Sequence, residues 1–393
     1  MLSRRLPSIS EPNAWTRALT ARRAAGADLV DLTESNPTRL GLGGAGPAEL
    51  AALADPAGGR YEPDPRGLPA ARAAVAADAS RRCAALDHED VVLTASTSEA
   101  YAHLFRLLAD PGDAVLAPAP SYPLVEPIAA LEGVRVATYR IVWDGRWHVD
   151  RASLEAAMTA TPRVRAIVVV QPNHPTGSCL APDESAWLET LAERHGVALI
   201  SDEVFADFPW PGVREPLPTL QGARRAPTFV LGGLSKSCGM PQLKLGWILL
   251  AGPCTARAQA RAGLEWIADL FLSVGTPVQL ALPELLAAGA GFRDRARRRV
   301  ADALARLESF AAERGDVDLL RGEGGWSAVL RLPARHSGEA WALALLERGV
   351  VVHPGHFYDL DGPHLVVGLL QPPDRFDEAL RRAGAALAEG CHV

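Results

Sequence analysis

The chain has 393 residues, which suggests two domains, because a single hydrophobic core rarely serves more than about 250–300 residues. With 48% hydrophobic and 22% charged residues and no run of eighteen apolar residues, it reads as a soluble globular protein with no membrane span and no membrane partner. The net charge of −6 argues against nucleic acid as the main partner.

The first residues of the chain hold little core of their own. The sequence begins MLSRRLPSIS, in which no apolar stretch follows the basic residues, so we expect no secretory signal. Residues 1–50 contain too few apolar side chains to fold alone and are expected to pack against a larger body.

Between residues 91 and 252, short β-branched runs alternate with helical stretches. Several of these runs are almost continuously apolar, which is typical of strands buried on both faces. Seven segments are predicted to be strands: VVLTAS from Val91, AVLAPAP from Ala114, VRVATYRI from Val134, AIVVVQP from Ala166, ALISDEVF from Ala198, TFVLGGLSK from Thr228 and KLGWILLAG from Lys244. The alternation predicts an α/β fold, with a mostly parallel seven-stranded sheet between helices in a large domain of residues 51–285.

After residue 285 the character of the chain changes. A long charged helix precedes the segment GGWSAVLRLP, a helix from about Gly338, the segments VVVHPGHF and HLVVGLL, and a last helix from about Asp374. These elements predict a smaller α+β domain, formed by residues 286–393 together with residues 1–50. The basic run RDRARRR, residues 293–299, is interpreted as a solvated face of the long helix.

No residue spacing predicts a metal site. The HPGH motif at residues 353–356 is loosely spaced around a turn glycine. The five cysteines are odd in number and scattered, so they suggest neither a disulfide framework nor a metal-binding pair, and they favour a reducing cytoplasm. They are Cys83, Cys179, Cys238, Cys254 and Cys391.

The informative polar residues in the middle of the chain all follow predicted strands. They are Ser96-Thr97-Ser98, Pro120-Ser121-Tyr122, Gln171 to Gly177, Asp202 to Phe205 and Ser235-Lys236-Ser237. In open α/β sheets, ligands bind beyond the carboxyl ends of the strands. The sequence therefore predicts one binding site along this edge of the sheet.

The residue types at this edge indicate a particular chemistry. A lysine in a dry pocket, such as Lys236, has a lowered pKa and can form an imine with a carbonyl group. Asp202 ends a buried strand and needs a cationic partner, which a pyridinium nitrogen would supply. The segment TASTSEA ends a strand and opens a helix, so its hydroxyl and N–H groups suit phosphate. With the flat ring of Tyr122, these parts describe a site for pyridoxal 5′-phosphate.

Each of these parts has a structural alternative when it is taken alone. Asp202 is also consistent with a helix N-cap, TSEA with a capping motif, and Tyr122 with a core position. The PTG segment by itself is a turn. Their occurrence together, in this order along one sheet, favours the cofactor site.

With these motifs the sequence resembles the class I/II aminotransferase family, whose members are fold-type I enzymes that use pyridoxal phosphate. The resemblance covers nearly the whole chain and implies the fold-type I architecture. It rests on the segments YEPDPRGLPAAR, TASTSEA, PSYP, PNHPTG, LISDEVF, LSKSCGMPQLKLGW and VVVHPGHF.

The resemblance implies roles for individual residues. Lys236 looks like the lysine that forms a Schiff base with the cofactor and shuttles the proton. Asp202 looks like the partner of the pyridine nitrogen, and Tyr122 like the ring that stacks on the cofactor. Tyr61 matches a tyrosine that reaches the cofactor phosphate of the neighbouring subunit, which implies a homodimer with shared active sites. The positions that match phosphate-binding residues are Ser96, Thr97, Ser98 and Ser235.

Four positions near the cofactor depart from the family pattern. His174 stands where an asparagine usually donates to the phenolic oxygen of the cofactor, and a histidine can also donate. Phe205 stands where a tyrosine is usual and cannot donate. Gly233 replaces a phosphate-binding serine or threonine. Lys244 replaces a phosphate-binding arginine, which keeps the charge but loses the bidentate fork.

A fifth departure concerns the substrate. In the family an arginine on a late strand binds the α-carboxylate of the substrate, but Val366 stands at that position here. Either another group binds the carboxylate or the substrate lacks one there. Arg39, which follows the Ser35-Asn36 segment expected to cover the substrate, is a candidate replacement, with a surface role as the alternative. Trp326 is expected to line the pocket or to belong to the core.

The predicted function is amino-group transfer between an amino acid or related amine and a 2-oxo acid, through a Schiff base on Lys236. The first alternative is another reaction through the same carbanion, such as elimination or replacement, racemisation, decarboxylation or oxidation. The second is a catalytically inert protein that binds pyridoxal phosphate.

Overall fold

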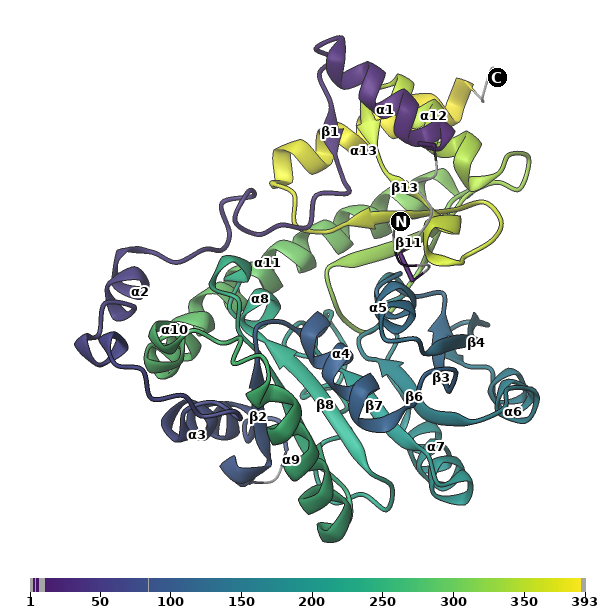
Figure 1. Cartoon of the computed structure of the whole chain (residues 1–393). Helices are drawn as coiled ribbons and strands as arrows, with labels where there is room; N and C mark the ends of the chain where they lie inside the picture. The colour runs from purple at the N-terminus through teal and green to yellow at the C-terminus, as the bar shows by residue number, and fades with distance from the viewer. Residues whose placement is uncertain (1–2, 4, 7–10, 84, 390–393) are drawn as a thin grey trace.

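The computed structural model describes residues 3, 5–6, 11–83 and 85–389, so Cys391 lies outside the described residues. The strands form an eight-stranded sheet, a four-stranded sheet and a two-stranded pair. Figure 1 places the large sheet in one half of the molecule and the four-stranded sheet in the other, and α11 extends from the first half into the second. Among the helices of the described residues, none is long and apolar enough to cross a membrane.

The helices are α1 (Ala14–Ala24), α2 (Pro47–Ala52), α3 (Pro69–Ala79), α4 (Thr97–Leu108), α5 (Val125–Leu131), α6 (Arg151–Ala160), α7 (Pro182–His195), α8 (Leu234–Ser237), α9 (Cys254–Asp269), α10 (Thr276–Leu280), α11 (Leu282–Arg314), α12 (Gly338–Glu347) and α13 (Pro373–Glu389). Short 3-10 turns are η1 (Pro56–Gly59), η2 (His88–Asp90), η3 (Pro241–Leu243) and η4 (Gly355–Tyr358). The strands are β1 (Val30–Asp31), β2 (Val91–Thr94), β3 (Ala114–Ala119), β4 (Arg135–Trp143), β5 (Trp147–Val149), β6 (Val164–Val170), β7 (Ala198–Asp202), β8 (Thr228–Gly233), β9 (Gly246–Ala251), β10 (Asp318–Leu320), β11 (Ser327–Arg331), β12 (Val350–Val351), β13 (His353–Pro354) and β14 (His364–Gly368).

The large sheet has the order β2-β9-β8-β7-β6-β3-β4-β5. The five strands from β8 to β4 run parallel to their neighbours, whereas β2, β9 and β5 are antiparallel additions. All seven predicted strands are present. The eighth, β5, was not predicted because it has only three residues and pairs with β4 in a hairpin, through Trp143 and Trp147.

Both faces of this sheet are covered by helices. Alternate residues of a strand point to opposite faces, so Val92 belongs to the hydrophobic cluster that includes residues of α4, α5 and α9, while Val91 and Leu93 belong to the cluster that includes residues of α3, α6, α7 and the start of α11. All five residues of β7 are buried as a result. The continuous apolar runs in the sequence therefore correspond to strands covered on both sides, as predicted.

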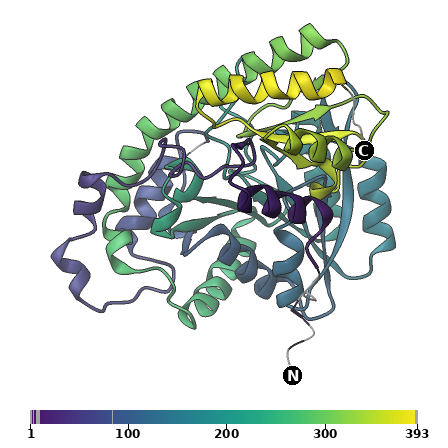
Figure 2. The ribbon, with the colours of Figure 1, turned by 90° about the horizontal axis from the view of Figure 1, so that it is seen from above.

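The four-stranded sheet has the order β10-β11-β14-β13 and is antiparallel. The N-terminal part of the chain joins it, because β1 pairs in parallel with β12 and Trp15 of α1 belongs to the same core as Trp341 of α12. Figure 2 shows α13 lying along the later part of α11 above this region. The division of the chain at residues 51 and 285 stays a prediction, since α11 runs through the second boundary.

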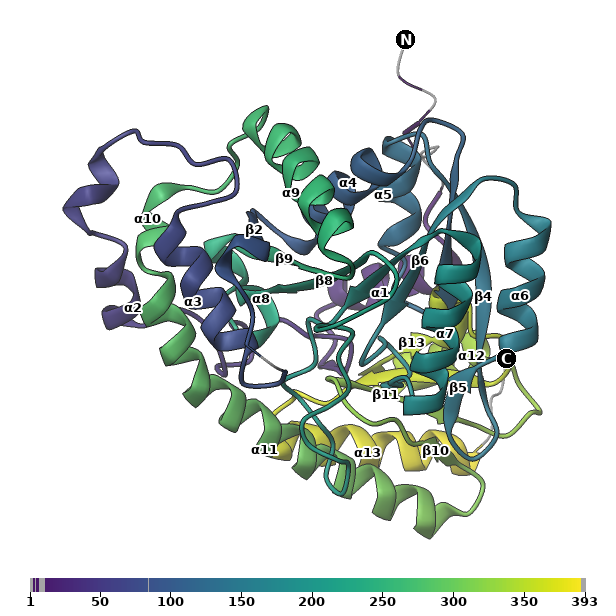
Figure 3. The same ribbon diagram turned by 90° about the horizontal axis from the view of Figure 1, so that it is seen from below.

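The arginine-rich run on α11 is not simply a solvated face, so that interpretation was wrong in part. Arg293 is buried and donates to the carbonyl oxygen of Ser237 at 3.3 Å. Arg295, Arg297 and Arg299 also donate to carbonyl oxygens of distant segments. Because an arginine has five donors on a long stem, one helix face can bind several loops in this way. Figure 3 shows α11 spanning the molecule from α10 to β10.

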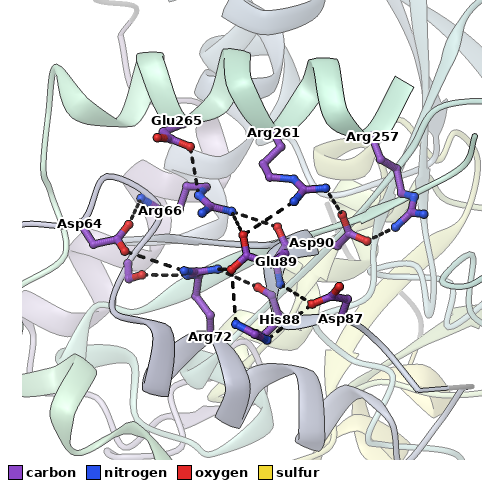
Figure 4. Close-up of polar contacts among 11 residues, drawn as sticks. Asp64, Arg66, Arg72, Asp87, His88, Glu89, Asp90, Arg257, Arg261 and Glu265 are labelled. Atoms are coloured by element: carbon purple, nitrogen blue, oxygen red, sulfur yellow. Dashed lines mark hydrogen bonds and ion pairs between the residues drawn. The ribbon is translucent and has the colours of Figure 1, made fainter. Parts of the chain in front are cut away.

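A network of ion pairs fixes the start of β2 (Figure 4). Glu89 of η2 pairs with Arg66 at 3.0 Å and with Arg72 of α3 at 3.1 Å. Asp90 pairs with Arg257 and Arg261 of α9. The hydrogen bonds from Arg72 and Arg66 lower the pKa of Glu89 to about 2. The network holds together three elements around the strand that leads to the predicted phosphate site.

Candidate active site

Lys236 lies on a single helical turn directly after a central strand. β8 ends at Gly233 and α8 covers Leu234–Ser237, so the lysine leaves the sheet at its carboxyl edge. The turn is held from within, because the Ser237 hydroxyl donates to the Gly233 carbonyl oxygen at 2.9 Å. The sequence-predicted lysine therefore has a defined place at the end of the sheet.

Two aromatic rings lie beside the Lys236 amine. Its Nζ is 5.5 Å from the centre of the Phe205 ring and 5.4 Å from that of the Trp326 ring. Burial lowers the pKa of Lys236, and the charge of Asp202 opposes that shift. An amine with a lowered pKa is more often neutral at pH 7, and only the neutral form is a nucleophile.

Asp202 is the last residue of the neighbouring strand β7 and is 7% exposed. Its Oδ1 accepts a hydrogen bond from the Val204 N–H at 3.2 Å, and its Oδ2 accepts one from the Tyr101 phenol at 3.1 Å. Burial nevertheless raises the pKa of Asp202 to about 6. Both donors are neutral, and although the charge of Lys236 favours the ionised form, Asp202 makes no direct ion pair with another described residue.

Tyr101 was not predicted from the sequence to lie at the site. It lies on α4, is 1% exposed, and shares the buried helix face with Leu104 and Phe105. The helical period of this stretch shows that Tyr101 faces the sheet. It does not show which strand end the phenol meets, because that depends on how α4 crosses β7.

The helix α4 begins at the predicted phosphate site. Ser96 is its N-cap, and its hydroxyl accepts from the Glu99 N–H at 3.2 Å, so that hydroxyl already serves the helix. The hydroxyls of Thr97, Ser98 and Ser235 make no hydrogen bond with another described residue. A helix N-terminus with nearby hydroxyl groups that lack protein partners is a suitable anion site.

Close backbone packing explains the glycine at position 233. A Cβ atom at Gly233 would lie 3.1 Å from the Cα of Gly246, and one at Gly246 would lie 3.1 Å from the Thr97 nitrogen. These distances are shorter than ordinary van der Waals contacts, so a serine at position 233 would need the neighbouring backbone to move. Glycine at position 233, where the family usually has serine or threonine, is therefore explained by the close approach of β8 and β9 to the start of α4.

His174 is enclosed by aromatic side chains. Its ring stacks on Phe205 with centroids 6.3 Å apart, and it meets the edges of Tyr122 and Tyr358 at 5.5 and 5.2 Å. Its Nδ1 is 3.1 Å from the Ser327 hydroxyl. Burial lowers the pKa of His174 to about 3, so its ring is neutral at pH 7 and keeps one N–H donor.

Tyr122 is 52% exposed at the rim of this group. Its loop is tied to the loop that carries His174 through the side chain of Asn173. The Asn173 amide donates to the Pro120 carbonyl oxygen at 2.8 Å, and its Oδ1 accepts from the Ser121 hydroxyl at 2.9 Å. The buried Asn173 amide therefore links the loops that carry the Tyr122 and His174 rings.

Two of the predicted cofactor-binding residues, Tyr61 and Lys244, make no side-chain hydrogen bond, ion pair or ring contact with the residues around Lys236 within the described chain. Tyr61 is 81% exposed and lines a surface pocket with Leu272 and Gln279. Lys244 has an exposed side chain and a left-handed φ of 53°, and it makes no hydrogen bond or ion pair with another described residue. Both side chains are free to meet a group from outside the described chain.

The chain that follows the Ser35-Asn36 segment reaches the loop after Lys236 at Gly44, whose N–H donates to the Gly239 carbonyl oxygen at 2.8 Å. Arg39, the candidate replacement clamp, is 75% exposed in its side chain and forms an ion pair with Glu34 at 3.3 Å. Nothing in these contacts directs Arg39 toward Lys236.

Trp326 and Val366 lie on the small-sheet side of the site. Trp326 is 1% exposed and packs on Phe205 and Phe208, so it belongs to the core as well as to the surroundings of Lys236. Val366 is 3% exposed in β14, paired with Val329 on one side and His353 on the other.

Three residues of this side were not among the predicted site residues, although His353 lies in the HPGH motif. Ser327 contacts His174, and the Nδ1 of His353 is 2.8 Å from the Tyr358 hydroxyl. They come from β11, β13 and η4, far along the chain from the motifs of the large sheet. Only the meeting of the two sheets brings them to the site.

This arrangement fits pyridoxal phosphate. Three features lie along one edge of the sheet: a lysine with a lowered pKa after β8, a buried carboxylate without a direct ion pair at the end of β7, and the N-terminus of α4 after β2, where hydroxyl groups lack protein partners. These are the groups needed to bind an aldehyde, a protonated ring nitrogen and a phosphate. Among the described residues there is no cluster of three or more side chains suited to a metal ion.

Comparison with known proteins points to one family. Residues 27–368 match the model of the family described as aminotransferase class I and II. Arginine–pyruvate transaminase of Pseudomonas aeruginosa is 30% identical over 346 residues, which cover 85% of this chain and 84% of that protein. Nicotianamine aminotransferase 1 of Oryza sativa subsp. japonica is 31% identical over 225 residues, but these span only 56% of this chain and 44% of the rice protein.

Solved structures agree on the fold. The alanine aminotransferase from Pyrococcus furiosus superimposes with a TM-score of 0.88, covering 99% of this chain and 100% of that one at 22% identity. An aspartate aminotransferase mutant of Thermus thermophilus gives 0.82, covering 98% of this chain and 100% of its own, at 25% identity. The likeness to the Pyrococcus furiosus protein concerns the fold alone.

Proposed function

Because the chain belongs to the aminotransferase class I and II family, whose members use pyridoxal 5′-phosphate, we propose that it transfers an amino group between an amino acid or related amine and a 2-oxo acid. The observation that carries this proposal is the position of the Lys236 amine at the end of β8, beside the buried carboxylate of Asp202 at the end of β7.

When bound, pyridoxal phosphate supplies an aldehyde that combines with amines and a ring that withdraws electrons from the carbon bearing the amino group. Lys236 is the residue that binds the aldehyde. Because its pKa is lowered, the Lys236 amine would be suited to exchange with a substrate amine and to take and return a proton at Nζ. The rings of Phe205 and Trp326 lie beside the Lys236 amine and would limit the access of water to it.

Asp202 holds the positive charge of the protonated ring nitrogen. The Val204 N–H and the Tyr101 phenol orient its carboxylate, one at each oxygen. An ion pair at this depth gains more than one in water, because the surrounding dielectric is low. Asp202 would thereby favour the protonated form of the ring nitrogen.

The remaining cofactor contacts are assigned by chemistry. Thr97, Ser98 and Ser235, with the first N–H groups of α4, bind the phosphate, while Ser96 caps the helix. Lys244 adds a charge from the exposed side. The other residues that would bind the cofactor are Tyr122, Phe205 and His174, and His174 would donate to the phenolic oxygen from Nε2 when the Ser327 hydroxyl donates to its Nδ1.

We also propose that the active form is a homodimer in which Tyr61 of one subunit completes the site of the other. Tyr61 is 81% exposed, and Trp266, Leu270 and Phe271 at the end of α9 are 69%, 64% and 51% exposed. Exposed apolar side chains gathered at one place on a chain are typical of an interface. The ion pairs of Figure 4 hold α9 against the segment that follows Tyr61.

Mixing two inactive variants tests the shared site. The Lys236→Ala variant lacks the amine, and the Tyr61→Ala variant lacks the contact donated to its partner. Random pairing of equal amounts gives heterodimers with one intact site, so the mixture should recover about a quarter of the wild-type activity. Recovery no greater than the sum of the two separate variants would exclude the shared site.

The transfer itself is tested by half-reactions. The holoenzyme is mixed with single amino acids or amines, without an acceptor, and absorbance is followed until the cofactor reaches its amine form. A 2-oxo acid should then restore the starting spectrum. Release of ammonia, carbon dioxide or hydrogen peroxide, or inversion of the α-carbon without the amine form, would instead assign one of the other carbanion reactions.

We propose a reducing compartment such as the cytoplasm, which the free thiols of Cys179, Cys238 and Cys254 support. Measuring the oxidation state of these thiols in freshly lysed cells under alkylation would test it, since disulfide formation at any of them would contradict it.

A further inference from the structure

A polar pair on the small-sheet side of the site has no part in the functions assigned above. The His353 Nδ1 on β13 lies 2.8 Å from the Tyr358 hydroxyl on η4. Tyr358 reaches across to the large sheet, because its carbonyl oxygen accepts from the Ser121 N–H at 3.1 Å and its ring meets His174 edge-on at 5.2 Å. The pair therefore lies next to the ring of residues around Lys236.

The strand register places His353 beside the position where a clamp is missing. β13 and β14 are antiparallel, and His353 is directly opposite Val366. Side chains directly opposite one another in an antiparallel pair lie on the same face of the sheet. His353 therefore faces the same side as Val366, whose side chain has no hydrogen-bond donor.

No arginine among the described residues replaces that donor beside His353. The side chains of His174, His353 and Tyr358 make no hydrogen bond, ion pair or ring contact with an arginine in the described chain. Arg39 is turned to solvent and is paired with Glu34. A carboxylate bound beside His174, His353 and Tyr358 would therefore meet neutral hydrogen-bond donors. Among these, His353 can become positively charged by taking up a proton.

The surroundings of His353 favour its neutral form until an anion arrives. Trp15 and Phe357 pack on its ring at 5.4 and 5.6 Å. Burial lowers the pKa of His353, while the charge of Asp31 opposes that shift. The other titratable groups that face it are Tyr358 and His174. A carboxylate beside the Nε2 would favour the protonated ring, as any nearby negative charge does.

We propose that His353, positioned by Tyr358, anchors the carboxylate of an amino acid or 2-oxo acid substrate and takes up a proton as that substrate binds. The inference rests on the proposed function, because it names the substrate class of the same site. It assigns to an imidazole the role that the resemblance gives to an arginine at position 366.

The proposal has a definite pH dependence. A bound carboxylate raises the pKa of His353 above its value in the free enzyme, so binding is strongest below the free-enzyme pKa. Affinity then falls about tenfold per pH unit as pH rises, until the pKa of the complex is passed. An arginine clamp would stay charged throughout and show no such fall between about pH 6 and 9.

The test uses 3-phenylpropionate, a carboxylate that has no amino group and cannot react. Its binding to the holoenzyme is measured by calorimetry at one pH in two buffers of different ionisation enthalpy, which gives the number of protons taken up. The His353→Gln variant should bind about tenfold more weakly and lose the proton uptake of the wild type. Tyr358→Phe should keep the uptake but bind less tightly.

His356→Gln is the matched control, because His356 is an exposed histidine three residues further along. It should behave as the wild type, and an unchanged cofactor spectrum in each variant shows that the site is intact. Equal proton uptake in His353→Gln and wild type would overturn the proposal. So would binding of 3-phenylpropylamine by an enzyme that does not bind 3-phenylpropionate. Neither result depends on turnover, so amino transfer can succeed while this inference fails.

Discussion

Tyr101→Phe is expected to change the acid–base behaviour of Asp202 without changing the fold. The substitution removes one of the two donors to the Asp202 carboxylate, the phenol 3.1 Å from Oδ2, and leaves the Val204 N–H on Oδ1. A hydrogen bond to a charged acceptor contributes about 1.5–3 kcal/mol, and about 1.4 kcal/mol corresponds to one pKa unit. The pKa of Asp202, about 6 in the cofactor-free chain, should therefore rise by about one unit or somewhat more.

The assay is the pH dependence of cofactor binding by cofactor-free enzyme. Binding of the ring nitrogen requires the ionised carboxylate, so affinity is present above the pKa of Asp202 and is lost as pH falls through it. The midpoint of that loss should lie about one unit higher in Tyr101→Phe. Tyr139→Phe is the matched control, because Tyr139 is an equally buried phenol that donates to the Val168 carbonyl oxygen at 2.8 Å. An equal midpoint in both variants would refute the reasoning.

Other predictions concern the edges of the site and the fold. Lys244→Arg should tighten cofactor binding by about threefold to tenfold, since a guanidinium binds phosphate through two hydrogen bonds, whereas Lys244→Gln should weaken it; no difference between the two variants would remove Lys244 from the phosphate site. Glu89→Gln should lower the free energy of unfolding at pH 7, measured by denaturant titration. Because the pKa of Glu89 is lowered to about 2 by Arg72 and Arg66, the difference from wild type should persist above about pH 4.5 and disappear as pH falls toward 2. Trp266→Glu should shift the homodimer toward monomer in light scattering; an unchanged mass would place the interface elsewhere.

Much of the large sheet was predictable because its strands carry a strong local pattern. Strands covered on both faces, such as β7, must be apolar throughout, and parallel strands must end at a common edge. Asp202 and Lys236 were recognised because polar residues interrupt that pattern at the strand ends. The short strand β5 lacks enough residues to show a period, and so it escaped notice.

The small-sheet side of the site depends on contacts between distant segments. Nothing local in VVVHPGHF indicates that His353 faces Val366 or bonds to Tyr358, since both facts follow from the register of β13 on β14 and the turn η4. The contacts of the arginine run on α11 likewise depend on segments that are distant in the sequence. Its spacing fits a solvated helix face, but loops from elsewhere in the chain bring carbonyl oxygens to Arg293 and Arg297.

The identity of the lysine that binds the cofactor can be measured directly. Lys236 and Lys244 are the only two lysines in the sequence, so borohydride reduction of the holoenzyme followed by peptide mapping has only these two side chains to distinguish. The proposal predicts one cofactor-derived label per chain, carried by Lys236. A label on Lys244, or no label on either lysine in an enzyme that shows the cofactor spectrum, would contradict it.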